Sequence, residues 1–100
     1  MKSLQEIILE KLKIKKSSYK YFPKTKEELQ DLLNKLVNER GNEGDFNDID
    51  TSKITDMSEL FENMEKFNGD ISKWDVSKVK YNENMFFNCS IEENYKPKFS

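Results

Sequence analysis

An internal repeat constrains this chain more than any other feature of its sequence. Two sets of positions recur at one fixed spacing: Asp50, Ser52, Lys53 and Ile54 return as Asp75, Ser77, Lys78 and Val79, and Leu60, Phe61, Asn63 and Met64 return as Met85, Phe86, Asn88 and Cys89. Each unit carries one apolar stripe, which a unit this small cannot bury alone. The repeat therefore predicts a fold in which consecutive units stack and share one core.

Within each unit, an extended piece is expected to precede a short helix. The extended pieces are residues 46–49 and 71–76, and the helices are residues 56–65 and 82–89. Apolar residues at helical spacing favour the helices. We assign six of the apolar positions to the core: Met57, Leu60, Phe61, Met64, Trp74 and Phe86.

Two helices are predicted before the repeat. Ser3 and Glu6 form a capping box that begins a first helix of about three turns. Thr25 and Glu28 form a second capping box, and the following helix is expected to end at Gly41. Its apolar residues keep helical spacing throughout: Leu29, Leu32, Leu33, Leu36 and Val37. Between the helices, residues 19–22 precede a proline and are expected to form a short edge strand or an extended arm.

The repeat strings carry a family resemblance. DIDTSKITDMSELF and FNGDISKWDVSKV resemble the BspA-like leucine-rich-repeat proteins of bacteria, whose units read approximately FNxDISxWDVSxVTxMxxMFxxC. The preceding string YFPKTKEELQDLLNKLV resembles the helical segment that often leads into such repeats. The resemblance covers residues 19 to about 90. It implies a leucine-rich-repeat-like solenoid and, for many members, surface adhesion or recognition of another protein.

Combining repeat and resemblance, we expect an α+β fold in which N-terminal helices cap a short leucine-rich-repeat-like solenoid of about two units. The chain is expected to be a single domain, residues 1–100, with a helical cap region at 1–41, two repeat units at 42–90 and a tail at 91–100. Two units alone are marginal. Either the caps supply the missing core, or the open end of the solenoid pairs with another copy as a homodimer.

The composition excludes several chemistries. There is no His, which excludes histidine-ligated zinc and nucleophile pairs that use imidazole as the base. Cys89 is the only cysteine, so no disulfide or CxxC site forms within the chain. Asp45, Asp48 and Asp50 suggest a calcium loop, but Ile49 stands at the third ligand position. We therefore expect no enzymatic activity, no cofactor and no metal.

Charge is distributed unevenly along the chain. Residues 39–70 carry ten acids against three basic residues, whereas residues 1–38 carry nine lysines against five acids. We predict a protein-binding surface made of seven acidic residues from the middle segment: Asp45, Asp48, Asp50, Asp56, Glu59, Glu62 and Glu65. The alternative is that these carboxylates form a solvated face, with the aspartates serving as turn and cap residues.

The lysine-rich segment 11–26 has aromatic residues between its lysines, a mixture that also occurs in nucleic-acid-binding proteins. Because the domain as a whole is acidic, we expect these lysines to solvate an edge rather than bind nucleic acid directly. We predict a protein–protein interaction module whose partner has a basic surface. The alternative is a small inhibitor encoded by a mobile element, an anti-CRISPR or other anti-defence protein that blocks a basic nucleic-acid-binding surface of a host complex.

The expected cellular location is inferred from the N-terminal residues and from the single cysteine. Glu6, Glu10 and Lys11 interrupt the apolar residues, so no secretion signal is expected, and no stretch is apolar enough to cross a membrane. With its single cysteine, the chain is expected to be cytoplasmic and to make no membrane contact.

Overall fold

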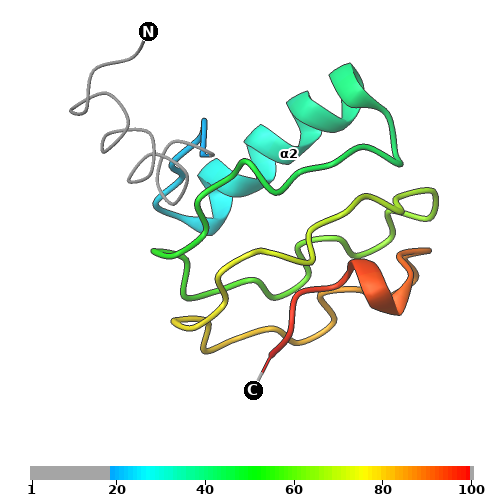
Figure 1. Cartoon of the computed structure of the whole chain (residues 1–100). Helices are drawn as coiled ribbons and strands as arrows, with labels where there is room; N and C mark the ends of the chain where they lie inside the picture. Colours follow the sequence, from blue (N-terminus) through cyan, green and yellow to red (C-terminus); the bar gives the residue numbers. More distant parts are fainter. Residues whose placement is uncertain (1–18, 100) are drawn as a thin grey trace, which may run out of the picture.

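A computed structural model describes residues 19–99 of the chain (Figure 1). These residues form one α-helix, α2 (Lys26–Arg40), and one short 3-10 helix, η1 (Glu93–Tyr95). Turns and coil make up the rest of the described residues, which contain no β-strand. Three isolated parallel bridges link distant segments: Tyr21 with Ile49, Asp45 with Asp70, and Asp56 with Tyr81.

The expected α+β fold with a leucine-rich-repeat-like solenoid is therefore wrong, because strands are absent from residues 19–99 and the bridges never extend into a ladder. The predicted helices at 56–65 and 82–89 are absent too. Glu59, Asn63, Asn84 and Asn88 have positive φ angles of 56° to 63°, and left-handed residues cannot continue a right-handed helix. The first predicted helix, in residues 3–16, lies outside the described residues.

The repeat of the sequence reappears in the hydrogen bonds between segments. We call residues 56–64 the first ribbon and residues 81–89 the second ribbon, because both are runs of successive turns. Four amides of the first ribbon donate to carbonyls of the second over 2.7 to 2.9 Å: Met57 to Tyr81, Glu59 to Glu83, Phe61 to Met85, and Asn63 to Phe87. The two ribbons therefore lie side by side in parallel, with α2 at the opposite end of the molecule from the second ribbon (Figure 1).

Helix α2 begins and ends where the sequence predicts. The Thr25 hydroxyl accepts from the Glu28 N–H at 3.1 Å, and the Glu28 carboxylate accepts from the Lys24 N–H at 2.8 Å. At the other end, Gly41 has a φ of 86°, which glycine adopts without strain, and its N–H donates to the Val37 carbonyl. The helix buries three leucines against the units: Leu29, Leu33 and Leu36.

The core is one cluster that joins α2 to both units. Phe61 lies at its centre, stacked on Phe67 with ring centroids 4.6 Å apart and on Phe86 at 5.7 Å. Trp74 packs against Phe61, and its indole N–H donates to the Phe46 carbonyl at 2.9 Å. Four of the six positions assigned to the core are buried in the cluster, and the other two, Met64 and Phe86, are half-buried and packed against it. The stacked units thus share a core without forming a regular sheet.

Candidate interaction surfaces

The seven acidic residues predicted to bind a partner lie in two groups. Asp45, Asp48 and Asp50 lie on the segment that contacts Tyr21 and the C-terminal end of α2. The other four lie along the first ribbon and the turn that follows it: Asp56, Glu59, Glu62 and Glu65. Of the residues described, no three acids or cysteines gather in a way that could hold a metal ion.

Asp48 is part of the fold rather than of a free surface. Both its carboxylate oxygens accept from the Arg40 guanidinium at 2.9 Å. Arg40 also donates to the Asp45 carbonyl at 2.9 Å, and its guanidinium lies 5.7 Å from the centre of the Phe46 ring. The hydrogen bonds from Arg40 hold the pKa of Asp48 below its usual value, although burial opposes this. Arg40, the only arginine of the chain, thereby joins α2 to the first unit.

Most of the remaining aspartates close turns. Each accepts from the backbone N–H two residues ahead, at 2.8 to 3.0 Å: Asp45 from Asn47, Asp50 from Ser52, Asp56 from Ser58, Asp70 from Ser72, and Asp75 from Ser77. In three of these turns the serine hydroxyl also donates to the same carboxylate at 2.6 Å. These are Asx turns. For Asp45, Asp50 and Asp56, a turn role is the alternative to partner binding that the sequence leaves open.

The same hydrogen bonds set the acidity of these aspartates. Hydrogen bonds from Ser58 and Ser77 hold the pKa values of Asp56 and Asp75 below the usual range. Burial raises the pKa of Asp70, but the hydrogen bonds from Ser72 and Asn47 and the charge of Lys73 together outweigh it, so that pKa is lowered too. In these three aspartates, the hydrogen bonds that close the turn therefore also favour the ionised carboxylate.

Three glutamates remain as carboxylates that the described part of the chain does not pair. Glu59 and Glu65 are exposed and Glu62 is half-buried, and none of them forms an ion pair or side-chain hydrogen bond with residues 19–99. Asp56, by contrast, lies 3.9 Å from the Lys26 ammonium. Of the seven predicted residues, Glu59, Glu62 and Glu65 are therefore the ones whose carboxylates are not held by residues 19–99, and partner binding by the acidic surface stays a prediction.

Sequence reasoning missed a second surface, at the end of the molecule away from α2. A groove of about 810 Å³ lies between the second ribbon and the C-terminal segment 93–99; we call it the edge groove. Phe87, 59% exposed, and Phe86 line it, and Tyr81, 54% exposed, begins the same ribbon. An exposed apolar patch beside a groove is a common feature of interaction sites, whereas a single exposed aromatic such as Phe22 is not.

A row of backbone amides runs along the same edge. Asn82, Asn84, Phe86 and Asn88 stand one repeat after the first-ribbon residues whose amides donate to the second ribbon. None of these four N–H groups donates to any residue within 19–99. The intervening amides bond locally, from Met85 to Asn82, Phe87 to Asn84 and Cys89 to Phe86, each at 3.2 Å. The edge therefore presents four donors in a row.

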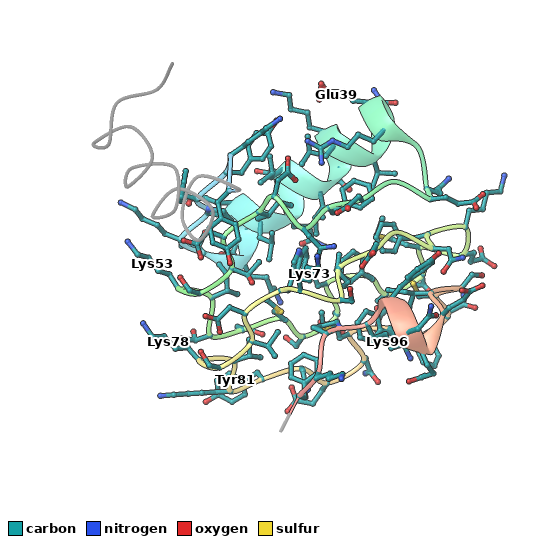
Figure 2. The ribbon with its side chains drawn as sticks, in the orientation of Figure 1. Glu39, Lys53, Lys73, Lys78, Tyr81 and Lys96 are labelled. Atoms are coloured by element: carbon teal, nitrogen blue, oxygen red, sulfur yellow. The ribbon has the colours of Figure 1, made fainter. Side chains whose placement is uncertain are left out.

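Lys96 lies at the margin of the edge groove. Its ammonium is 4.9 Å from the centre of the Phe86 ring and 2.7 Å from the exposed Glu93 carboxylate. In Figure 2, Tyr81 and Lys96 both lie in the half of the molecule away from α2. Lys96 stands where the two preceding units have the buried Phe46 and Ile71, so its alkyl chain covers core while its charge reaches solvent.

The sequence did contain a sign of this surface. Phe87 stands one repeat after Glu62, so the second unit replaces a charged outward position with an aromatic one. An aromatic residue at an outward position of a repeat indicates a contact, and comparing the outward positions of the two units would have found it.

In the described part of the chain, no helix is both long and apolar enough to cross a bilayer.

Comparison with known proteins identifies a family model that matches most of the chain. No curated protein and no solved structure matches the chain. A family model described as "Mycoplasma protein of unknown function, DUF285" matches residues 27–96, which include α2, both ribbons and η1. This family is related to the BspA-like proteins, so the resemblance of the repeat strings is confirmed at that level. Because the match spans more than half of its length, the chain belongs to the DUF285 family.

Proposed function

We propose that this chain is a non-enzymatic protein-interaction module and that the edge groove is its binding surface. The observation that carries the proposal is the combination of exposed aromatic rings and unbonded amides on one edge, beside a groove of about 810 Å³. Burying an exposed Phe87 side chain against a partner would contribute about 1.5 to 3 kcal/mol. The resemblance to BspA-like proteins, many of which recognise other proteins, supports the same function.

Two of the three glutamates, Glu59 and Glu62, belong to the first ribbon. The Glu59 N–H donates to the Glu83 carbonyl, so this ribbon lies beside the second ribbon, which lines the groove. We expect a partner to bury Phe87 in an apolar contact and to place basic residues near Glu59 and Glu62. We call these two glutamates the charged rim. Rim charges act mainly on the association rate and on its salt dependence.

Two variants separate the apolar contact from the charged rim. Phe87→Glu places in the second ribbon the residue that the first ribbon carries at Glu62, so the fold should tolerate it. The paired substitution Glu59→Lys with Glu62→Lys reverses the rim charge and should change stability by no more than about 0.5 kcal/mol. Each variant, with the unaltered chain, is immobilised and exposed to a lysate of the native host at about 0.05 M and 0.5 M salt, and bound proteins are quantified.

The expected result is a protein that the unaltered chain retains and that Phe87→Glu loses at both salt concentrations. The charge-reversed variant should retain less of the same protein at low salt and an equal amount at high salt, because screening removes the rim contribution. If Phe87→Glu retains that protein as well as the unaltered chain does, the groove is not the binding surface. If charge reversal alone abolishes retention at both salt concentrations, the acidic residues are the binding surface instead.

A further inference from the structure

Three exposed lysines lie close together on one side of the stacked units. Lys53 and Lys78 stand one repeat apart, and Lys80 follows two residues later, beside the exposed Thr55. We call these four residues the lysine corner. None of the three lysines forms an ion pair within residues 19–99. The edge groove is lined by other residues, so the lysine corner is a separate surface.

Hydrogen bonds before and after two matching turns hold the lysine corner in register. The Thr51 hydroxyl donates to the Asp75 carbonyl at 2.9 Å before the turns, and the Lys80 N–H donates to the Thr55 carbonyl at 2.7 Å after them. Backbones joined in this way lie about 5 Å apart. The lysines of the two turns are therefore neighbours, and Figure 2 shows Lys53 and Lys78 at the same margin of the molecule.

Burial alternates along both segments of the corner. Ile54 is buried and Val79 is half-buried, and each lies between two exposed residues of the corner. Because both inner residues pack in the core, the side chains on either side of them point away from it. Two residues span at most about 7 Å of chain. The corner therefore presents three ammonium groups to solvent from backbone positions about 5 to 7 Å apart.

Acidic residues bound the lysine corner at both ends. Asp50 and Asp75 precede the turns, and each carboxylate accepts from the serine N–H two residues ahead at 3.0 Å. Glu59 and Glu83 follow in the ribbons, where both are exposed. A long polyanion such as a nucleic-acid strand would run from the lysines onto these carboxylates, which repel it. The anionic partner that fits the corner is therefore short.

We infer that the lysine corner binds an extended acidic segment of a partner protein, with carboxylates on alternate residues. Such carboxylates stand about 7 Å apart on one side of an extended chain, which matches the separation of Lys78 and Lys80. Lys53 reaches the same segment from the neighbouring unit. Because the corner lies on the side of the stack, its exposure does not depend on what stands beside the second ribbon.

Tyr81 adds an apolar position to the segment that fits. It directly follows Lys80, is 54% exposed and forms a parallel bridge with Asp56 in the first ribbon. A segment that continues past Lys80 therefore meets an aromatic ring rather than a fourth lysine. The fitting segment carries an apolar residue next to its second carboxylate.

Chemical-shift mapping by NMR on the full chain tests the inference. The probe is the synthetic peptide acetyl-Ser-Leu-Glu-Ser-Glu-Leu-Ser-amide, whose sequence is the same in both directions, so either direction of binding is sampled. At about 0.05 M salt, the peptide should shift the amides of residues 53–55 and 78–81 with a Kd of about 1 to 10 mM, because exposed ion pairs contribute modestly. Raising the salt to about 0.5 M should weaken binding at least about fivefold.

Matched protein variants separate the lysine corner from the net charge. Lys78→Gln with Lys80→Gln should weaken peptide binding at least about fivefold. Lys35→Gln with Lys66→Gln removes two charges from exposed lysines elsewhere and should change the Kd less than about twofold. Phe87→Glu alters the edge groove and should also bind the peptide within about twofold of the unaltered chain. All these positions are exposed, so the urea midpoints should stay the same.

Two control peptides test the charge and the spacing. One has glutamine in place of both glutamates, and the other, acetyl-Glu-Leu-Ser-Ser-Ser-Leu-Glu-amide, has the same composition with its glutamates far apart. Each should bind at least about fivefold more weakly than the probe. A single-stranded hexathymidylate should also bind more weakly than the probe, because the acidic residues beside the corner repel it.

Three results would overturn the inference: no shift at about 10 mM probe, equal weakening by the two lysine pairs, or equal binding of either control peptide. Tighter binding of hexathymidylate would assign the corner to phosphate polymers, and loss of the probe in Phe87→Glu would place the peptide in the edge groove. Either result would overturn the inference too. Because the lysine variants leave the groove unchanged, the inference can fail while Phe87→Glu still loses the lysate protein, so the proposed function is tested separately.

Discussion

Arg40 holds Asp48 through two hydrogen bonds of 2.9 Å each, and this pair fastens the end of α2 to the first repeat unit. The side chains are 27% and 18% exposed, so solvent screens the pair only in part. The same guanidinium lies 5.9 Å from the Tyr21 ring centre, which adds the N-terminal arm to the junction. Asp48, one of the acidic residues predicted to bind a partner, therefore stabilises the junction between α2 and the first unit.

We predict that Arg40→Lys destabilises the protein by about 1 to 3 kcal/mol, because a lysine ammonium cannot make the paired hydrogen bonds of a guanidinium. The free energy of unfolding from urea titration measures the effect. Asp48→Asn should cost a similar amount, and the double variant should cost much less than the sum. Additive effects of the two substitutions would contradict a direct coupling.

Stability should fall in acid. The folded-state pKa values of Asp48, Asp70 and Asp75 lie below the usual value of about 3.9, so their contribution is complete above that pH and is lost as pH falls through the folded-state values. Urea midpoints should therefore be level near neutral pH and decline between about pH 5 and pH 2. In Asp48→Asn the decline should be shallower. An equally steep decline in that variant would show that Asp48 is not among the responsible groups.

Gly69 and Gly44 occupy matching positions one unit apart, and we predict that alanine is tolerated at only one of them. A Cβ at Gly69 would lie 2.5 Å from a Phe46 ring carbon and 2.8 Å from a Phe67 ring carbon, both in the core. Gly69→Ala should therefore destabilise by about 1 to 3 kcal/mol. At Gly44 the nearest atom is 3.0 Å away, so Gly44→Ala should cost no more than about 1 kcal/mol. Equal urea midpoints for the two variants would contradict this difference.

Cys89 should react slowly with thiol reagents in the folded protein. The thiol is half-buried at the end of the second ribbon, as its counterpart Met64 is at the end of the first, and its Sγ lies 3.7 Å from the Phe67 carbonyl. Burial raises the pKa of the Cys89 thiol, so less of the reactive thiolate is present at neutral pH. Labelling by a maleimide or disulfide reagent should be slower than in urea-unfolded chain at the same pH. Equal rates in the two states would contradict the burial.

Local patterns in the sequence were enough to predict some elements and not others. Thr25, Glu28 and Gly41 define α2 correctly, because caps and helical spacing act within a few residues. The pattern predicts helices in place of the ribbons, because the spacing of Met57, Leu60, Phe61 and Met64 fits the apolar stripe of a helix as well as it fits the buried side of a ribbon. The ribbons differ from helices in the positive φ of residues such as Glu59 and Asn63, where the amides turn outward to carbonyls of the neighbouring ribbon.

The sequence by itself determined which side chains are apolar and shared between units, where α2 begins and ends, and the spacing at which the units repeat. These are consequences of hydrophobic periodicity and of short-range capping. Only the tertiary structure decided that Asp48 pairs with Arg40 and that alternate amides of the second ribbon donate to no group within residues 19–99. Both features depend on contacts between residues that are distant in sequence and become neighbours only when the units stack. Local conformational preferences of the sequence do not determine such contacts.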